Sequence, residues 1–394
     1  MTIAVAVIVV AGVVYLHPFR TASSHRVLPG APASPTPEQL DTHVSATYDF
    51  VTPALGWAVV TENLDTSPRF WVFRTTDGAK HWKQQLAGRC AALGTSDLRM
   101  FDRTRGEFDL CDPLLAYRTA NGGATWTPVA LPSSEIAYMT FGDYQHGWYL
   151  TWSLGSPGPG VPAVEKITRF LKTADGGVTW TTLPQPPLPS FTSKGNPFNL
   201  QFRGALTGWM GTYSNAPVVY STVDGGLTWK ELVLPSVLLQ PGKGGFIGTE
   251  IKLLPGSSVL ASTSDAFGDV YGFTTDDGGL IWHRIQPPPG NTTFDDYAFV
   301  DATHWWALRN STLYKSSDGG QTWKMTDLLF DQWDYLPHPL DANRAWAELT
   351  PGAGLISPPN VQGGSFYIPG GGLAMTSDGG RHWTYVSVPQ PQLS

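Results

Sequence analysis

Acidic side chains are the residues of this sequence whose type and spacing come closest to a catalytic pattern. Asp265 and Asp269 stand close together in a loop-forming stretch, and Glu62, Asp65 and Glu165 lie in other stretches of this kind. Two carboxyl groups about 5 to 9.5 Å apart can cleave a glycosidic bond, one as proton donor and the other as base or nucleophile. Single loop acids are usually only solvated, so Asp265 and Asp269 define one hypothesis, glycoside hydrolysis.

Other catalytic patterns are missing from the sequence. It contains no Gly-x-Ser-x-Gly elbow, phosphate-binding loop or dinucleotide fingerprint in a strand-to-helix setting. Neither Cys90 nor Cys111 is accompanied by ligands at zinc spacing, so we expect no metal and no cofactor. His81 and His382 occupy equivalent places in a repeated phrase, which suits turn residues better than catalytic bases.

An eight-residue phrase with the consensus S/T-x-D-x-G-x-T-W recurs seven times and organises the chain. The copies span 75–82, 119–126, 173–180, 222–229, 275–282, 316–323 and 376–383. Their third position holds Asp77, Asn121, Asp175, Asp224, Asp277, Asp318 and Asp378. A carboxylate there can accept backbone N–H bonds from the residues ahead of it, and the glycines supply a positive φ. Each copy therefore predicts a tight turn between two strands, which we call a box turn.

The phrase resembles the Asp-box, or BNR, repeat of sialidases, xyloglucanases, sortilin-like receptors and the photosystem II assembly and stability factors. The match is strong in the copies containing Asp175, Asp224, Asp318 and Asp378, which have Gly-Gly pairs. The first copy departs from it at Ala79 and His81, the second at Asn121 and the fifth at Ile281, which lowers the expected rigidity of those turns. In those families the repeat joins the third and fourth strands of a propeller blade. The resemblance thus implies a β-propeller.

A second signal precedes most box turns, a Phe followed six residues later by Gly-Trp. Examples are Phe50 with Trp57, and Phe141 with Trp148, whereas the fifth repeat has Val259 and Leu260 in place of this signal. Apolar residues before the Phe predict one strand and the Trp opens a second, so each unit reads as a four-stranded antiparallel meander. Seven units between residues 43 and 388 predict an all-β, seven-bladed β-propeller. Trp71, Trp152, Trp305 and Trp333 lie outside both signals, and we expect them to pack between blades.

Long connections gather at one end of the predicted propeller. The box turns lie at the opposite end from the excursions 153–166, 184–197, 233–249 and 349–369. Because variable loops on a rigid scaffold usually carry binding, we expect a protein or glycan partner at the loop-rich face. The alternative is that these Pro-rich loops are only connections and bind no ligand. The candidate ligand-binding residues there are Trp152, Lys166, Tyr213, Asn215, Asp265 and Asp269.

The combined repeats most resemble the photosystem II assembly and stability factors, which implies a non-catalytic scaffold that binds a protein. The basic patch of that family is not evident, since Lys166, Arg169, Lys194, Lys243 and Lys252 are scattered. A xyloglucanase-like glycosidase that uses Asp265 and Asp269 is the enzymatic alternative, although those enzymes pair two propellers. A sialidase is disfavoured because no Arg-Ile-Pro phrase is present. The repeat itself says nothing about catalysis.

Composition fits a globular domain made of many short strands. The 394 residues are 41% hydrophobic and include 43 Gly and 33 Pro, and the formal net charge of −7 disfavours a nucleic-acid partner. We expect a monomer. If the protein is exported, a disulfide between Cys90 and Cys111 is possible, with two buried thiols as the alternative.

An apolar run at the start of the chain predicts export. Residues 1–16 are short for a spanning helix of about 20 residues but long enough for a signal peptide. We therefore expect a signal peptide or signal anchor at 1–19, a Pro/Ala-rich linker at 20–42, the propeller at 43–388 and a tail at 389–394. A buried first strand is the alternative for the apolar run. We expect an exported bacterial protein, located outside the cell or in the cell envelope, with membrane contact only through the N-terminal segment.

Overall fold

The computed structural model describes most of the chain from residue 44 onward. The described ranges are 44–62, 68–89, 97–109, 115–132, 137–154, 165–186, 197–212, 218–235, 246–254, 256–265, 270–287, 296–301, 303–309, 312–331, 337–349, 354–356 and 372–391. Regular structure in these ranges consists of β-strands, with no α-helix. Within them, accordingly, no helix has the length and apolar character needed to cross a membrane.

The first four blades follow one another along the chain. Blade 1 contains β1 (Val44–Phe50), β2 (Gly56–Glu62), β3 (Arg69–Thr75) and β4 (Lys83–Arg89). Blade 2 contains β5 (Asp97–Met100), β6 (Gly106–Asp109), β7 (Leu115–Thr119) and β8 (Thr127–Ala130). Blade 3 contains β9 (Ala137–Phe141), β10 (Gly147–Leu154), β11 (Glu165–Thr173) and β12 (Thr181–Thr182). Blade 4 contains β13 (Pro197–Arg203), β14 (Thr207–Thr212), β15 (Val218–Thr222) and β16 (Lys230–Val233).

Three further blades complete the ring. Blade 5 contains β17 (Phe246–Leu253), β18 (Val259–Asp265), β19 (Val270–Thr275) and β20 (His283–Arg284). Blade 6 contains β21 (Asp296–Phe299), β22 (Trp305–Arg309), β23 (Thr312–Ser316) and β24 (Lys324–Asp331). Blade 7 contains β25 (His338–Pro339), β26 (Ala345–Leu349), β28 (Gly372–Thr376) and β29 (Thr384–Val386). The predicted all-β, seven-bladed propeller is therefore confirmed.

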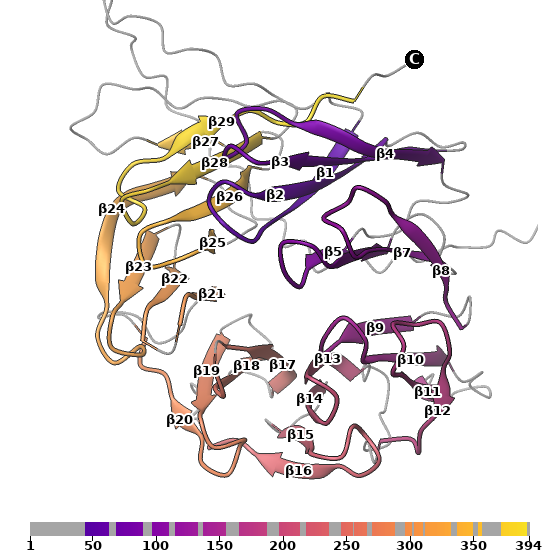
Figure 1. Cartoon of the computed structure of the whole chain (residues 1–394). Coiled ribbons are helices and arrows are strands. Elements are labelled where there is room, and N and C mark those ends of the chain that lie inside the picture. Colours follow the sequence, from indigo (N-terminus) through magenta and orange to yellow (C-terminus); the bar gives the residue numbers. More distant parts are fainter. Residues whose placement is uncertain are drawn as a thin grey trace, which may run out of the picture. The chain divides into compact units, whose positions relative to one another are not determined.

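Each blade is an antiparallel meander whose strands are hydrogen-bonded in chain order. The first strands, such as β5, β13 and β21, lie toward the middle of the ring, and the fourth strands, such as β8 and β16, lie at its outside (Figure 1). One strand departs from the repeat, because β27 (Gly354–Ile356) pairs with β24 and adds a fifth strand to blade 6. The sequence predicts only a loop there, since the box pattern carries no information about strands added at a blade's edge.

The box turns have one hydrogen-bonding pattern. In blade 3 the Asp175 carboxylate accepts bonds from the backbone N–H and hydroxyl of Thr179, at 2.9 and 2.6 Å, and from the Thr173 hydroxyl at 2.8 Å. Thr173 Oγ1 in turn accepts the Gly177 N–H at 2.8 Å. Both glycines of this turn, Gly176 and Gly177, have positive φ. Side chain and backbone together fix the turn.

Departures from the consensus leave this pattern nearly intact. Ala79 adopts a φ of 62° in place of a glycine. Asn121 Oδ1 accepts the Thr125 N–H at 2.9 Å, and the Asn121 amide donates to the Thr125 hydroxyl at 2.9 Å. Ile281 keeps the backbone bond to Asp277 at 3.1 Å. The predicted loss of rigidity in these three turns is therefore not seen in their hydrogen bonding.

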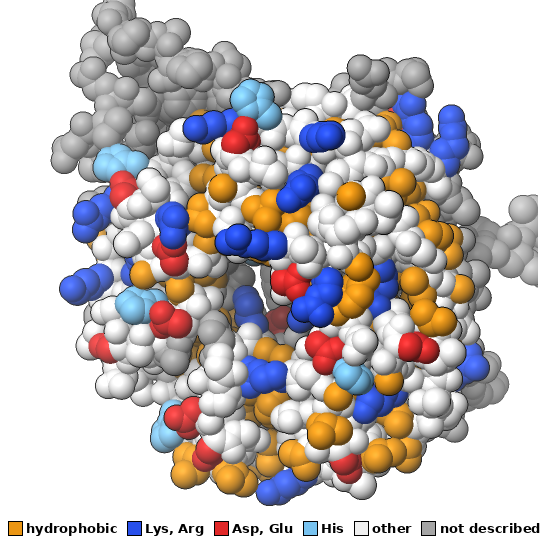
Figure 2. Space-filling model, viewed as in Figure 1, with side chains coloured by type: hydrophobic (Ala, Val, Ile, Leu, Met, Phe, Trp, Pro, Cys, Tyr) orange, Lys and Arg blue, Asp and Glu red, His pale blue; other side chains and the backbone are white. Residues whose placement is uncertain are grey.

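Among the described residues of six of the seven blades, all but blade 5, a backbone hydrogen bond joins the box turn to the turn between the first and second strands of the same blade, which we call the inner turn. Gly122 N–H donates to Thr104 O at 2.7 Å in blade 2, and Gly225 N–H donates to Leu206 O at 2.7 Å in blade 4. These bonds place the inner turns and the box turns on one face of the propeller, which we call the box face. This face appears in Figure 2, with a hollow near its centre.

Tryptophans on the second strands form much of the core between blades. Trp57, Trp148 and Trp306 are fully buried, and the indole N–H of Trp148 donates to Gly225 O of the next blade at 2.9 Å. Burial of a large aromatic side chain contributes about 2 to 3 kcal/mol. Trp71 and Trp305 are also buried, as expected for packing residues.

Among the described strands, none is shared between the first and last blades, because the four strands of each come from one continuous stretch of chain. The ring is therefore closed by contacts between blades 7 and 1 that involve side chains. The indole N–H of Trp82 donates to Ser387 O at 2.8 Å, and Tyr48 N–H donates to Glu348 Oε1 at 3.1 Å. Trp346 and Val388 of the last repeat belong to the same buried cluster as the apolar residues of blade 1.

Candidate binding site

A pocket of about 650 Å³ opens on the box face between blades 2 and 3. One wall comes from β5 and the inner turn of blade 2, and the other from the inner turn of blade 3. Its lining consists of Arg99, Met100, Phe101, Arg105, Gly142, Asp143, Tyr144 and Gln145. Two cations and two aromatic rings therefore meet in one cavity.

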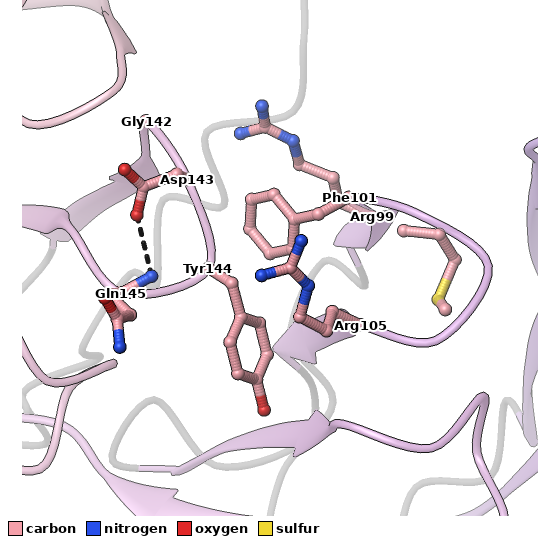
Figure 3. A pocket seen from close by; sticks show the side chains of 8 residues that line it. Arg99, Phe101, Arg105, Gly142, Asp143, Tyr144 and Gln145 are labelled. Carbon is pink, nitrogen blue, oxygen red and sulfur yellow. Dashed lines mark hydrogen bonds between the residues drawn. The ribbon is translucent and has the colours of Figure 1, made fainter.

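The blade 2 wall is basic and aromatic. The Arg99 guanidinium lies 4.8 Å from the centroid of the Phe101 ring and donates to Phe141 O at 2.6 Å. Arg105 is exposed, and its Nε donates to Asp102 Oδ2 at 2.6 Å. In Figure 3 the Phe101 ring lies between the side chains of Arg99 and Arg105. One ion pair leaves several guanidinium donors of Arg105 available to a ligand.

The blade 3 wall is a turn held by Asp143. Its Oδ1 accepts the Gln145 N–H at 2.8 Å, as Figure 3 shows, and also the His146 N–H at 2.8 Å. Burial works to raise the pKa of Asp143, but the backbone and ring of His146 outweigh it, and the pKa lies below its usual value. Asp143 is thus a carboxylate that shapes the turn and presents Tyr144 to the pocket.

Arg118 supports the pocket from below. It is buried, pairs with Glu107 at 3.3 Å, and donates to Gly176 O at 2.6 Å and to Tyr144 O. Its guanidinium lies 4.1 Å from the centroid of the Tyr144 ring. Burial lowers the pKa of Arg118, although an arginine remains charged at neutral pH. Tyr144 is therefore held by a cation of the neighbouring blade.

This support is part of a recurring contact between blades. The residue before the box Ser/Thr is basic in four blades, at Arg74, Arg118, Lys172 and Lys315. Lys172 Nζ donates to Ala205 O of blade 4 at 2.8 Å, and Lys315 Nζ donates to Ala342 O of blade 7 at 2.7 Å. Each lysine also lies over the second-strand Trp of its own blade. Buried or half-buried cations thus fix inner turns of neighbouring blades on the box face.

The two acids at or beside this pocket, Asp102 and Asp143, are held in their ionised form. A hydrogen bond from the Thr104 hydroxyl has the largest effect on the pKa of Asp102, and bonds from the Thr104 backbone and from Arg105 add to it. Together they keep this pKa well below its usual value. Asp143 is also ionised, so neither acid can supply a proton near neutral pH. Guanidinium groups bind carboxylates through paired hydrogen bonds, and aromatic rings pack against extended chain. A carboxylate-bearing polypeptide fits these groups.

None of the six predicted ligand-binding residues can be compared with this pocket, because their side chains are not described. Trp152, Lys166 and Asp265 have their backbones in β10, β11 and β18, but their side chains are not among those described. The described ranges do not include Tyr213, Asn215 or Asp269, nor Cys90 and Cys111 of the expected disulfide. Most residues of the four predicted binding loops also lie outside the described ranges. The loop-rich face therefore stays a prediction.

Glu62 is the one acid of the glycosidase hypothesis whose side chain is described. It is buried and accepts two bonds from the Arg69 guanidinium, at 2.8 and 2.9 Å. The Arg69 hydrogen bonds lower its pKa, which opposes a role as proton donor. In the described part of the chain, no group of three or more His, Cys, Asp or Glu side chains could hold a metal ion.

The arginines of this pocket were not predicted from the sequence. The basic residues named there were Lys166, Arg169, Lys194, Lys243 and Lys252, and binding was expected at the face that carries the long loops. The signal was nevertheless present, since Arg99, Arg103 and Arg105 fall within one short stretch around the inner turn of blade 2. Short turns were treated as structural only.

Comparisons with known proteins identify neither a family nor a ligand for this chain. No protein-family model matches the chain. A stretch of 55 residues is 42% identical to the photosystem II assembly protein Ycf48 of Thermosynechococcus vestitus. That stretch is 14% of this chain and only 16% of the length of the relative.

Several solved propellers resemble the structure at low identity. The structure described as "YCF48 bound to D1 peptide" is 16% identical, with a TM-score of 0.48, over 91% of this chain and 97% of that one. YCF48 from Cyanidioschyzon merolae is 18% identical, with a TM-score of 0.46, over 75% and 84% of the two chains. A GH74 xyloglucanase from Xanthomonas campestris is 14% identical, with a TM-score of 0.44, over 90% and 69%. Likenesses of this size do not indicate what the chain binds.

Proposed function

We propose that this protein is an exported, non-catalytic propeller scaffold that binds a protein partner through the pocket on its box face. The observation that carries the proposal is the convergence of Arg99 and Arg105 with Phe101 and Tyr144 in one cavity. Two guanidinium groups select a carboxylate, while the rings provide apolar contact area. A polypeptide with acidic residues and a free carboxyl end combines both features.

The proposal extends to the family and location of the protein. We take the seven box turns to be Asp-box repeats, on the strength of their sequence and hydrogen bonds. The 55-residue match to a relative named as an assembly protein supports a role in building a protein complex. The apolar residues at 1–16 support export and a position in the cell envelope. In this view the protein has no substrate and works by holding a partner.

A peptide-binding measurement tests the proposal. The probe is a soluble 12-residue peptide of Gly, Ser, Asp and Glu with a free carboxyl end, followed by isothermal titration calorimetry. Arg99→Gln and Arg105→Gln should each weaken binding about tenfold or more, since each removes a charge-assisted hydrogen bond. Arg103→Gln is the matched control, because Arg103 is exposed on the same turn but does not line the pocket.

The result that would overturn the proposal is equal loss of affinity in all three variants, or no effect in any. Equal loss would indicate attraction by net charge alone. An amidated, acid-free version of the peptide should bind at least about tenfold more weakly, because it lacks the carboxylates that guanidinium groups prefer.

Glycoside hydrolysis remains the competing proposal, carried by Asp265 and Asp269 of the sequence. A panel of β-glucans and sialosides incubated with the protein distinguishes the two. Turnover that is lost in Asp265→Asn or Asp269→Asn, with affinity little changed, would replace the scaffold by an enzyme, because a general acid or base acts chiefly on the chemical step.

A further inference from the structure

Large apolar side chains project from the box face of three consecutive blades. Six of them, each between 53% and 77% exposed, lie in the box turns or inner turns of blades 3, 4 and 5. They are Val178, Leu206, Val223, Leu227, Leu280 and Ile281, and together we call them the apolar rim. Figure 2 shows hydrophobic side chains along the lower part of this face, where blades 3 to 5 lie in Figure 1.

The fold does not require apolar residues at these positions. The sixth residue of the box turn is Val178, Leu227 or Leu280 in blades 3 to 5. The same position is polar or charged in blades 1, 6 and 7, where it holds Lys80, Gln321 and Arg381. The Asp carboxylate accepts the same kinds of bonds in both groups. Exposure of aliphatic side chains costs free energy and gains nothing within this chain. Exposed aliphatic side chains gathered on neighbouring turns of one face are a feature of interaction sites.

The box turns that carry the apolar rim pack closely against the preceding blade. A Cβ atom at Gly226 of blade 4 would lie 2.9 Å from Phe170 of blade 3, and one at Gly279 of blade 5 would lie 2.6 Å from Leu232 of blade 4. Each box turn is therefore pressed against the preceding blade. Preorganised apolar side chains lose little conformational freedom when a partner docks.

The rim continues from the arginine pocket. Gly176 N–H, two residues before Val178, donates to the carbonyl of the pocket residue Gln145 at 2.8 Å. Gly204 N–H, two residues before Leu206, donates to the carbonyl of the pocket residue Gly142 at 3.1 Å. Two backbone hydrogen bonds thus join the wall of the pocket to the start of the rim.

The charge pattern favours a polypeptide over a lipid surface. Carboxylates stand among the apolar tips, at Asp175, Asp224, Asp276 and Asp277. Anionic headgroups would be repelled by these residues, whereas polybasic surfaces attract them. A polypeptide can place its acidic part at Arg99 and Arg105 and its apolar part on the rim.

We propose that the box turns of blades 3 to 5 form a docking rim for the apolar segment of a polypeptide whose acidic segment occupies the neighbouring pocket. The inference rests on the proposed function and specifies its partner. The partner must combine an acidic end with an apolar surface, as an amphipathic helix beside an acidic tail does.

Three synthetic peptides test the rim. The first is the acidic 12-residue peptide described above. The second joins this acidic end to an amphipathic helix with leucines along one face, and the third replaces those leucines by glutamine. The rim variant is Val178→Gln with Leu227→Gln and Leu280→Gln, which gives these turns the residue that blade 6 has at Gln321. Val233→Gln is the control, because Val233 is 68% exposed on β16 and outside the rim.

We expect the leucine peptide to bind at least about 100-fold more tightly than the other two, at roughly tenfold for each aliphatic side chain covered. The rim variant should lose this gain and still bind the acidic peptide with unchanged affinity. Val233→Gln should keep the gain. Circular dichroism and thermal unfolding of the rim variant should match those of the parent protein, because only exposed side chains change.

Each other outcome has a distinct meaning. If the leucine peptide binds no better than the glutamine peptide, or its advantage survives in the rim variant, the rim is not a docking surface. If the leucine peptide binds through the rim while the acidic peptide fails to bind, the proposed pocket is wrong and the rim stands. If neutral phosphatidylcholine vesicles bind the parent protein but not the rim variant, the occupant is a lipid surface and the polypeptide assignment is overturned.

Discussion

The box turns of blades 3 to 5 and those of blades 1, 6 and 7 have the same backbone and different surfaces. In blade 4 the Thr228 hydroxyl donates to Asp224 at 2.6 Å, and Leu227 beside it is exposed. In blade 7 the His382 ring takes the place of that hydroxyl, 2.5 Å from Asp378, and Arg381 stands where Leu227 does. The hydrogen-bonded residues hold the turn, and the positions between them are free to carry recognition.

This difference separates scaffold from surface within a single repeat. The first Ser/Thr, the Asp and the second glycine position have the same partners in both groups of turns, so these positions serve folding. The sixth position is apolar in blades 3 to 5 and polar in blades 1, 6 and 7, so the exposed surface differs from one sector of the face to another. A repeat protein can in this way use one stable turn for several purposes.

The largest effect should come from breaking the shared turn, and it should be equal in both groups. Thr222 and Thr376 are buried, and each hydroxyl accepts a glycine N–H at 3.0 Å and donates to the Asp carboxylate. Thr222→Val and Thr376→Val should each lower the free energy of unfolding by about 2 kcal/mol, because a buried N–H loses its partner. Urea unfolding measures this. A difference above about 1 kcal/mol between the two variants would show that the apolar tips contribute to folding.

A smaller effect is expected at the seam between blades 7 and 1. Burial raises the pKa of Glu348 to about 7, against the opposing hydrogen bond from Tyr48 N–H. The raised pKa means that ionisation costs stability as pH rises from about 4.5 to 7, while the protonated acid costs nothing at lower pH. Glu348→Gln should therefore raise the free energy of unfolding at pH 8 by about 1 to 2 kcal/mol and change it little at pH 4. A gain at pH 4 as large as that at pH 8 would contradict this assignment.

The smallest effect concerns acid stability, which the two groups of turns should share. Side-chain hydrogen bonds from Thr228 and from Thr322, with the backbone bonds that follow, lower the pKa values of Asp224 and Asp318 to about 2. Their stabilising effect is therefore complete above about pH 4 and is lost as pH falls toward 2. Asp224→Asn and Asp318→Asn should each destabilise slightly at pH 7 and not at pH 2, with the turn preserved as it is around Asn121. Unfolding midpoints of both variants and of the parent protein, measured from pH 2 to pH 7, test this. A pH-dependent loss of stability in one variant and not in the other would contradict the expected similarity of the two turns.

The fold could be predicted almost completely because each repeat contains local sequence signals for its own strands and turns. The box turn and the Phe with Gly-Trp signal mark both turns of the box face in most repeats, and the strands between them follow. Blade 5, which lacks Gly-Trp, still forms with β18 in the expected place. The added strand β27 could not be foreseen, because its pairing with β24 depends on a contact between two blades and not on local sequence.

The candidate site was harder to predict, because proximity in a propeller joins residues from different repeats. Arg105 and Tyr144 belong to separate blades, and their contact depends on the buried Arg118 beneath. The apolar residues of the box turns carry no signal in the sequence that separates them from variation within a repeat. Their exposure on three neighbouring blades is visible only in the structure.

Hydrogen–deuterium exchange of the protein with the acidic, leucine-bearing peptide tests the central claim most directly, because it reports which face is covered. The account predicts slowed exchange in residues 99–105 and 142–145 and in the box turns at 173–180, 222–229 and 275–282, with the polar box turns at 316–323 and 376–383 unchanged. Slowed exchange confined to the loops at 153–166, 184–197, 233–249 and 349–369 would contradict it and return recognition to the opposite face.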